Sequence, residues 1–319
     1  MSAPTVSYVI AAWNAAPFIA RAIHSALDQA DDFEVIVVDD ASTDDTAAVV
    51  AAIENPRLRY HRLERNSGPA AARNKGFDLA RGRWVGVLDA DDYLLPGRTA
   101  MLLDRAEAGE LDICADNVWI ELQDAPEVRR LQVQETLDGE AEVVTFDDYC
   151  ARNQMLGGGA NYGYLKPLFR ADYLRAHNLR YSEALKVGED FLLVAEALIQ
   201  GARFERIRAA GYVYLTRSGS ISHRLQPEHA DAMVAADERF LIQYAPLMTS
   251  NAHKAMLRHL KGLRAGAAFM HMVEAVKRRD PTRFVRHVRT QPGALRHFWL
   301  PISAKIGRTT QKIRDLVRS

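Results

Sequence analysis

The sequence predicts an α/β fold in which a mostly parallel central sheet is flanked by helices and followed by a helical C-terminal extension. Short apolar runs with strand character alternate with helical patterns from the start of the chain, as is typical of βαβ units. Two of these runs, residues 35–38 and 84–88, lead directly into aspartates. In an open α/β sheet the ligand crevice lies outside the carboxyl ends of the strands, so we expect these carboxylates at a binding site.

Local signals predict each element of this alternation. The strands are short runs rich in valine, isoleucine and tyrosine. Ile19, Ile23 and Leu27 recur at helical spacing and predict a helix after the first strand. Ser42 is the expected N-cap of a second helix with Asp44 in its first turn, and a proline favours the start of a third. The expected strands are residues 5–12, 33–38, 58–63 and 83–88, and the expected helices are residues 18–28, 42–53, 69–80 and a segment beginning at residue 96.

Beyond residue 112 the pattern loosens. Residues 123–148 are polar, acidic and only weakly periodic, so they predict an insertion or an edge hairpin. From residue 227 the pattern is helical to the end of the chain. Charge divides the chain as well: residues 254–319 hold 16 Lys and Arg but three acids, which leaves 25 basic and 38 acidic residues for the rest. The N-terminal portion is therefore acidic and the C-terminal portion is basic.

Composition limits the class of protein. With 319 residues, of which 48% are hydrophobic, the chain can bury one large core and carry an extension. No apolar run approaches the roughly 18 to 20 residues of a membrane span. The first residues lack the basic region of a signal peptide, so we expect the mature chain to begin there. Cys114 and Cys150 make neither a disulfide framework nor a zinc pattern, which favours a reduced cytoplasm.

Four motifs in succession resemble those of family 2 glycosyltransferases, which have the GT-A nucleotide-diphospho-sugar transferase fold. They are residues 5–14, 37–44, 66–74 and 88–92, and Gly188-Glu189-Asp190 is similar to the family's acceptor-side acidic motif. The closest type is the bacterial exopolysaccharide group, including succinoglycan-pathway enzymes. The resemblance implies a catalytic domain at residues 1–225, with a nucleotide-binding half at 1–115 and an acceptor-side half at 116–225. The basic helical extension then occupies residues 226–319.

The resemblance implies a site for a UDP-sugar and for Mg²⁺ or Mn²⁺. Asp91 would ligate the metal, and Asp89 would contact the ribose or reach the metal through water. Asp40 resembles the carboxylate that accepts the N3 proton of uracil, and Arg217 would bind the diphosphate through paired hydrogen bonds. A metal at this place neutralises the leaving diphosphate. The remaining implied donor-site residues are Ala11, Trp13, Asn14, Asp39, Arg73 and Ala90, with His223 as a further metal or phosphate contact.

On the acceptor side the resemblance implies Asp190 as the general base and Glu189 as the residue that positions it or the acceptor. Asp92 would line the sugar pocket or cap the following turn. Lys166 follows the Gly157–Gly159 loop as a cation without an assigned role and is placed at the acceptor or sugar pocket. The loop lacks the Gly-Lys-Ser/Thr of a phosphate-binding P-loop.

Other interpretations stay open for these residues. Aspartates after strands also cap helices, and Glu189 and Asp190 suit the first turn of a helix for electrostatic reasons alone. His223 could be structural. The basic C-terminal extension could lie on an anionic membrane surface, pack on the catalytic domain as a bundle, or bind nucleic acid, the last without a recognised motif. A non-catalytic nucleotide-sugar-binding or scaffold protein is a second candidate, because motifs record ancestry and not turnover.

Two further patterns narrow the expected chemistry. The sequence disfavours a dinucleotide-dependent oxidoreductase, because no Gly-x-Gly-x-x-Gly follows the first strand. The first strand ends in Ala-Ala-Trp-Asn where the family usually has Pro-x-Tyr-Asn, and the Gln-x-x-Arg-Trp of processive synthases is absent. We therefore expect a cytoplasmic enzyme, peripheral on the inner membrane, that adds one sugar per encounter to a lipid-diphosphate-linked glycan or polysaccharide. No nucleic-acid partner is expected.

Overall fold

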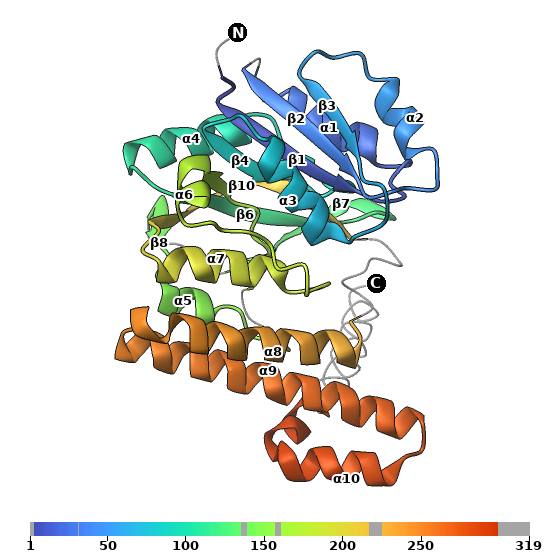
Figure 1. The fold of residues 1–319 in the computed structure, drawn as a ribbon, viewed down its shortest axis with the longest axis vertical. Coiled ribbons are helices and arrows are strands. Elements are labelled where there is room, and N and C mark those ends of the chain that lie inside the picture. Colours follow the sequence, from blue (N-terminus) through green and yellow to red (C-terminus); the bar gives the residue numbers. More distant parts are fainter. Residues whose placement is uncertain (1–2, 31, 135–138, 157–160, 217–224, 299–319) are drawn as a thin grey trace, which may run out of the picture.

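The computed structural model describes residues 3–30, 32–134, 139–156, 161–216 and 225–298. A twisted sheet with helices on its two sides forms the upper part of the molecule, and long helices of the C-terminal extension lie below it (Figure 1). The predicted residues Arg217 and His223 lie outside the described part of the chain, as do Gly157–Gly159 and residues 299–319.

The N-terminal half follows the predicted alternation of strands and helices. Four parallel strands lie in the order β3-β2-β1-β4, and each buried strand is an apolar run. Ala12 at the end of β1 lies beside Asp39 at the end of β2, so two predicted site segments emerge together. The elements are β1 (Val6–Ala12), α1 (Ile19–Leu27), β2 (Phe33–Asp39), α2 (Thr46–Ala51), β3 (Leu58–Arg62), α3 (Pro69–Leu79) and β4 (Trp84–Val87).

The expected N-cap at Ser42 is wrong, because α2 begins at Thr46. The Ser42 hydroxyl instead accepts a hydrogen bond from the backbone N–H of Asn14 at 2.9 Å. The backbone N–H of Ser42 donates to the Asp39 carboxylate at 2.8 Å. The preceding Ala41 has a φ of 57°, which turns the chain back at this point. Ser42 therefore joins the loops after β1 and β2 and does not start a helix.

Beyond β4 the sheet is mixed and no longer parallel. The short strand β9 lies antiparallel between β4 and β6, and β10 lies parallel to β6. Strand β9 follows a loop and not a crossover helix, so nothing constrains it to run parallel to its neighbours. The elements here are β5 (Tyr93–Leu94), α4 (Arg98–Ala108), β6 (Ile113–Leu122), η1 (Tyr162–Tyr164), β9 (Leu168–Arg170), α6 (Ala171–Ala176), α7 (Glu189–Ile199) and β10 (Phe204–Thr216).

The segment predicted as an insertion or edge hairpin contains a hairpin. Strand β7 (Ala125–Leu131) pairs antiparallel with β6, directly after a tight turn. Strand β8 (Ala141–Val143) then pairs with the beginning of β10. Helix α5 (Phe146–Ala151) also begins within the segment, where Thr145 and Asp148 form a reciprocal capping box.

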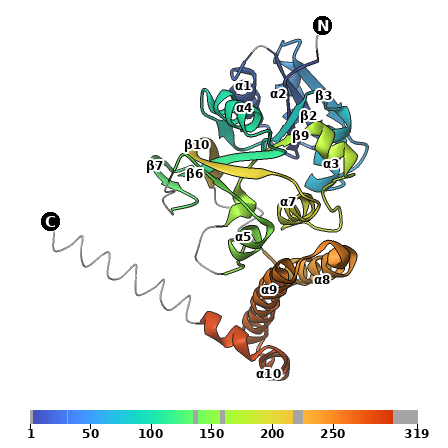
Figure 2. The same ribbon diagram turned by 90° about the vertical axis from the view of Figure 1, so that its left-hand side faces the viewer.

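The helical prediction from residue 227 is confirmed as far as residue 298. Helices α8 (Pro227–Tyr244) and α9 (Ser250–Lys277) cross beneath α5 and α7 (Figures 1 and 2). Phe240 stacks on Phe146 with ring centroids 5.9 Å apart, and Met256 is fully buried in the main core. These two helices therefore share the core of the catalytic domain. Helix α10 (Pro281–Thr290) and η4 (Pro292–Phe298) pack on the far end of α9, and η3 (Ala245–Leu247) lies between α8 and α9.

None of the helices in the described ranges has an apolar stretch long enough to span a bilayer.

Candidate active site

The predicted site segments meet where β1, β2 and β4 end, facing the beginning of α7. The loop after β1 contacts the loop after β2 through Asn14, whose side-chain Oδ1 accepts the backbone N–H of Thr43 at 2.8 Å. The loop after β2 contacts the segment before α3 through Asp40. These contacts build one crevice from motifs that are separate in the sequence, as expected for the carboxyl edge of an α/β sheet.

Asp39 and Asp40 are neighbours with different roles in this crevice. The Asp39 carboxylate is fully buried and accepts hydrogen bonds from the Ser42 N–H, the Tyr60 hydroxyl at 2.6 Å and Arg62 at 2.9 Å. Burial alone would raise the pKa of Asp39, but these donors outweigh it and lower the pKa below its ordinary value. Because protein groups occupy its oxygens, Asp39 shapes the predicted donor pocket from behind.

Asp40 holds the loop that starts α3. Its carboxylate accepts the backbone N–H groups of Ser67 at 2.7 Å and Gly68 at 2.8 Å. Gly68 has a φ of 91°, a conformation that favours glycine. Ala11, in β1, is half-buried, and Trp13, which follows β1, is 52% exposed, so its indole offers an open face. Both oxygens of Asp40 thus already accept backbone N–H groups, and the exposed indole of Trp13 is the aromatic surface at this end of the sheet.

A buried chain of alternating charges crosses the crevice. Arg73, from α3, donates to Glu189 at 2.6 Å and to Asp89 at 2.7 Å. The ammonium of Lys166 lies 3.1 Å from the other oxygen of Asp89 and 3.0 Å from Asp190. The series of charged contacts therefore runs from Glu189 through Arg73, Asp89 and Lys166 to Asp190. It joins the predicted donor side to the predicted base.

Each charge in this chain depends on its neighbours. Burial opposes ionisation of Asp89, but Lys166 and Arg73 together hold the pKa of Asp89 well below its usual range. Burial likewise disfavours the Lys166 ammonium, yet Asp190 and Asp89 raise the pKa of Lys166 well above its ordinary value. An uncompensated charge at such a place would cost several kcal/mol. Arg73, predicted as a nucleotide contact, is therefore also a structural link, and its Nε–H has no hydrogen-bond partner in the described part of the chain.

Lys166 takes a more central place than the sequence predicted. It was expected at the acceptor or sugar pocket without a role, and the structure puts it between Asp89 and Asp190. Its backbone carbonyl accepts a hydrogen bond from Arg98, which also forms a fully buried ion pair with Asp116 at 2.8 Å. Sequence reasoning missed Arg98 and Asp116, because no local pattern marks a charged pair that is joined only by tertiary packing.

Asp92 does not line an open sugar pocket, contrary to the expectation. Its carboxyl group is 1% exposed and accepts hydrogen bonds from the Tyr212 hydroxyl at 2.6 Å and the Leu215 N–H at 2.8 Å. The Tyr212 hydroxyl also accepts the backbone N–H of Asp89 at 3.1 Å. Asp92 and Tyr212 thus fasten the acidic turn after β4 to β10. Burial, with the charges of Asp89 and Asp91, raises the pKa of Asp92 well above its ordinary value.

The acidic turn at residues 89–92 lies at the place predicted for a divalent cation. Within the described ranges no three His, Cys, Asp or Glu side chains converge as a complete metal site. Both oxygens of Asp89 are engaged by Arg73 and Lys166, and Asp91 is half-buried at the turn beyond the buried Ala90. Mg²⁺ is commonly held by one or two carboxylates together with substrate phosphates.

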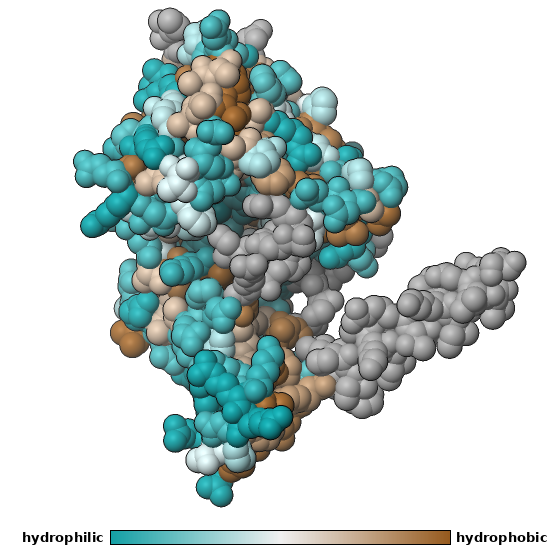
Figure 3. Space-filling view, turned by 90° about the vertical axis from the view of Figure 1, so that its right-hand side faces the viewer, coloured by the Kyte–Doolittle hydropathy of each residue, from teal (hydrophilic) through white to brown (hydrophobic). Residues whose placement is uncertain are grey.

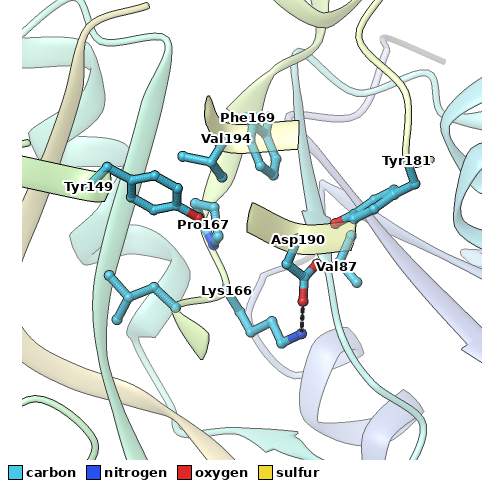
Figure 4. Close-up of a pocket in the computed structure, with 9 residues that line it drawn as sticks. Val87, Tyr149, Lys166, Pro167, Phe169, Tyr181, Asp190 and Val194 are labelled. Atoms are coloured by element: carbon cyan, nitrogen blue, oxygen red, sulfur yellow. Dashed lines mark hydrogen bonds and ion pairs between the residues drawn. The ribbon is translucent and has the colours of Figure 1, made fainter. Parts of the chain in front are cut away.

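A small cavity of about 10 Å³ lies beside the base candidate, close to the minimum that one ordered water needs. Figure 4 shows Lys166 and Asp190 in ion contact, with the rings of Tyr149 and Tyr181 on either side. The Tyr149 hydroxyl is buried and has no hydrogen-bond partner among the described residues. Sequence reasoning missed both tyrosines, since isolated aromatic residues carry no motif.

Comparisons with known proteins agree with this architecture. The family model described as glycosyl transferase family 2 matches residues 7–163. The succinoglycan biosynthesis protein ExoO of Rhizobium meliloti (strain 1021) is 41% identical over 306 residues, covering 96% of this chain and 87% of that protein. The succinoglycan biosynthesis protein ExoU of the same organism is 36% identical over 299 residues, covering 92% of this chain and 86% of that protein.

Solved structures show the same fold. The crystal structure of S. aureus TarS 1-349 in complex with UDP-GlcNAc matches with a TM-score of 0.60 and 19% identity, over 90% of this chain and 92% of that one. The fold and the relatives together identify the family. The chain belongs to glycosyltransferase family 2 and has the GT-A fold.

Proposed function

We propose that this glycosyltransferase moves a single sugar from a UDP-sugar to a lipid-linked or polysaccharide acceptor, with inversion at the anomeric carbon and with Mg²⁺ or Mn²⁺. The observation that carries the proposal is the buried charge chain, in which Lys166 lies 3.1 Å from Asp89 on the donor side and 3.0 Å from Asp190 on the acceptor side. Relatives named for succinoglycan biosynthesis support a surface glycan as product, and a similar fold crystallised with UDP-GlcNAc supports the nucleotide.

The chain's own residues provide the donor site. Asp40 would accept the uracil N3 proton, and the exposed indole of Trp13 would stack on the base. The buried Nε–H of Arg73 is a donor left over for a ligand oxygen. Asp91 would hold Mg²⁺ or Mn²⁺, with Asp89 behind it, and Arg217 would bind the diphosphate. When bound, the ion supplies Lewis-acid neutralisation of the leaving diphosphate.

Asp190 would act as general base in a single displacement. The acceptor hydroxyl oxygen forms a bond to the anomeric carbon while the bond from that carbon to the UDP oxygen breaks, and the hydroxyl proton passes to the Asp190 carboxylate. Attack from the face opposite the leaving group inverts the configuration. A positioned base contributes typically ~10²- to 10⁴-fold. Lys166 holds one Asp190 oxygen, and the 24% exposure of this side chain leaves it accessible to the acceptor.

The basic C-terminal extension supports the proposal of an anionic membrane surface on the cytoplasmic side. Helix α10 has no buried residue, and Arg279, Arg286 and Arg289 are exposed there without a carboxylate partner in the described ranges. Hydrophilic side chains mixed with hydrophobic ones cover the lower end of the molecule (Figure 3). A surface of this kind is attracted to acidic lipids by about 1 kcal/mol for each basic residue near them.

Binding and turnover separate an enzyme from a scaffold that only binds nucleotide-sugars. Purified protein is titrated with UDP and a panel of UDP-sugars, with Mn²⁺ and then with chelator, and transfer is measured on lipid-linked acceptors. We expect Asp91→Ala to abolish metal-dependent donor binding, and Asp190→Asn to keep binding but lose transfer. Asp172→Asn, at an exposed acid in the first turn of another helix, is the matched control. Near-normal turnover by Asp190→Asn would refute the base assignment.

A further inference from the structure

The helical extension reaches the helix that carries the proposed base. Phe191 directly follows Asp190 in α7 and is buried. Two rings stack on it almost in parallel: His259 of α9, with centroids 4.2 Å apart and planes at 16°, and Tyr149 of α5, at 5.5 Å and 7°. Tyr149 also lines the cavity beside Asp190 and Lys166. The contact between α9 and α7 therefore lies one residue from the proposed base.

Helix α8 supplies the charged neighbour of the His259 ring. His259 Nε2 lies 3.1 Å from the carboxylate of Asp237, and both side chains are buried. Burial raises the pKa of Asp237, and His259 partly offsets this. The other ring nitrogen of His259 has no hydrogen-bond partner in the part of the chain that the structure describes. An apolar side chain would fill this space without that cost, so the polar contact has a role beyond filling space.

A second contact from α8 touches the residue that precedes the acidic pair. Gly188 has a φ of 86° and caps the start of α7. A Cβ atom at Gly188 would lie 2.7 Å from the terminal methyl of Met233 in α8. The backbone conformation therefore favours glycine here, and the Met233 side chain of α8 packs directly against it. The extension holds the start of α7 from two places, Gly188 and Phe191.

We propose that α8 and α9 position the Glu189–Asp190 pair for catalysis, and that His259, oriented by Asp237, is the positioning residue that acts through Phe191. The extension is then part of the machinery of transfer as well as a carrier of basic charge. This inference rests on Asp190 being the base. It also explains why α9 shares the core of the catalytic domain, with His259 among its buried residues.

The test compares two histidines of the same helix in the full-length protein. His259→Ala removes the stacked ring, and His253→Ala, at an exposed position on α9, is the control. We expect His259→Ala to lower kcat at least 10-fold while the Kd for UDP with Mn²⁺ stays within twofold, because the donor pocket lies on the other side of the charge chain. We expect His253→Ala to change neither value.

Variants of Asp237, the α8 residue beside His259, test the same proposal independently if His259→Ala folds poorly. Asp237→Asn keeps a polar group of the same size beside His259 and should retain most of kcat, whereas Asp237→Leu removes this polar contact and should lower kcat at least fivefold. A kcat for both His259→Ala and Asp237→Leu within twofold of wild type would overturn the proposal. Loss of kcat and of UDP binding to the same extent would also overturn it, since that is the result of a general structural role.

Hydrogen exchange separates this proposal from the proposed function. In His259→Ala, amides of residues 188–194 should exchange faster, while those of β1 and β4 should keep the wild-type rate. If wild-type protein transferred no sugar, the assignment of function would fail, yet the exchange result would still report whether α9 holds the start of α7. Unchanged exchange at residues 188–194 would refute the proposal that α9 holds the start of α7.

Discussion

Replacing Lys166 with methionine removes the ammonium from the centre of the buried charge chain and keeps most of the side-chain volume. The side chain of Lys166 is 7% exposed, and its ammonium contacts Asp89 at 3.1 Å and Asp190 at 3.0 Å. After the substitution Asp89 still has Arg73 as a partner at 2.7 Å. Among the described residues Asp190 has no other ion-pair partner, so the loss falls mainly on this carboxylate.

The size of the effect follows from the burial of the two carboxylates. Removing one member of a buried ion pair typically costs ~3–5 kcal/mol. Because Asp89 and Asp190 are 21% and 24% exposed, water can partly replace the ammonium, and we expect the lower end, about 3 kcal/mol. At roughly 2–4 °C per kcal/mol this lowers the Tm by about 6 to 12 °C. A base that is displaced by about 1 Å can lose ~10²-fold in kcat.

The assay combines thermal unfolding with transfer kinetics. Lys186→Met is the matched control, because Lys186 is exposed in the loop before α7 and has no ion pair in the described ranges. The double variant Lys166→Met/Asp190→Asn completes a cycle. If Lys166 acts through Asp190, Asp190→Asn should lower kcat much less in the Lys166→Met protein than in the wild-type protein.

Additive effects would refute this reasoning. If Lys166→Met and Asp190→Asn changed kcat by independent factors, Lys166 would not act through Asp190. A wild-type kcat for Lys166→Met would show that the contact of Lys166 with Asp89 and Asp190 has no role in catalysis.

Three other perturbations test separate parts of the structure. Arg98→Met leaves Asp116 buried with only the Gly211 N–H beside it, and should lower the free energy of unfolding by about 3–5 kcal/mol in urea titration, far more than the same change at the exposed Arg175. Burial raises the pKa of Glu196 from 4.5 to about 7, so the folded state binds the proton more tightly and stability falls as pH rises through this window. Glu196→Gln should therefore unfold at a higher temperature than wild type at pH 8 and at a similar one at pH 4, and an equal difference at both values would contradict the assignment. Ending the chain after Phe298 removes five basic residues and should weaken sedimentation with anionic liposomes while transfer to a soluble acceptor is kept, whereas an earlier end near Ala252 would delete the buried part of α9 and cost activity as well.

Local sequence patterns were sufficient to predict most elements of the N-terminal half. An apolar strand followed by aspartates specifies its own structure, since the strand is buried and its polar end must lie at the edge of the sheet. The same reasoning failed at Ser42, where a contact from Asn14 in another loop decided the conformation. Beyond β4 the mixed order of strands was also not predicted, because the pairing of short strands depends on partners far away in the chain.

The role of each acidic residue depends on where its side chain points and on how deeply it is buried. Asp39 and Asp40 are adjacent in sequence, yet Asp39 faces Tyr60 and Arg62 while Asp40 holds the start of α3. Asp92 was expected to line the sugar pocket or to cap the following turn, and its carboxylate is buried against Tyr212 and the backbone N–H of Leu215. A motif gives the residue type and its place at the strand end, but it does not give the partner that each carboxylate meets.

The sequence by itself determined the family, the alternation of strands and helices, and the carboxylates at the strand ends, because these depend on residues close together in the chain. Only the tertiary structure decided that Lys166 joins Asp89 to Asp190, that Arg73 reaches Glu189 across 116 positions, and that His259 stacks on Phe191. The physical reason is that buried charges and rings are stable only beside matching partners, and folding, not spacing in the sequence, brings those partners together.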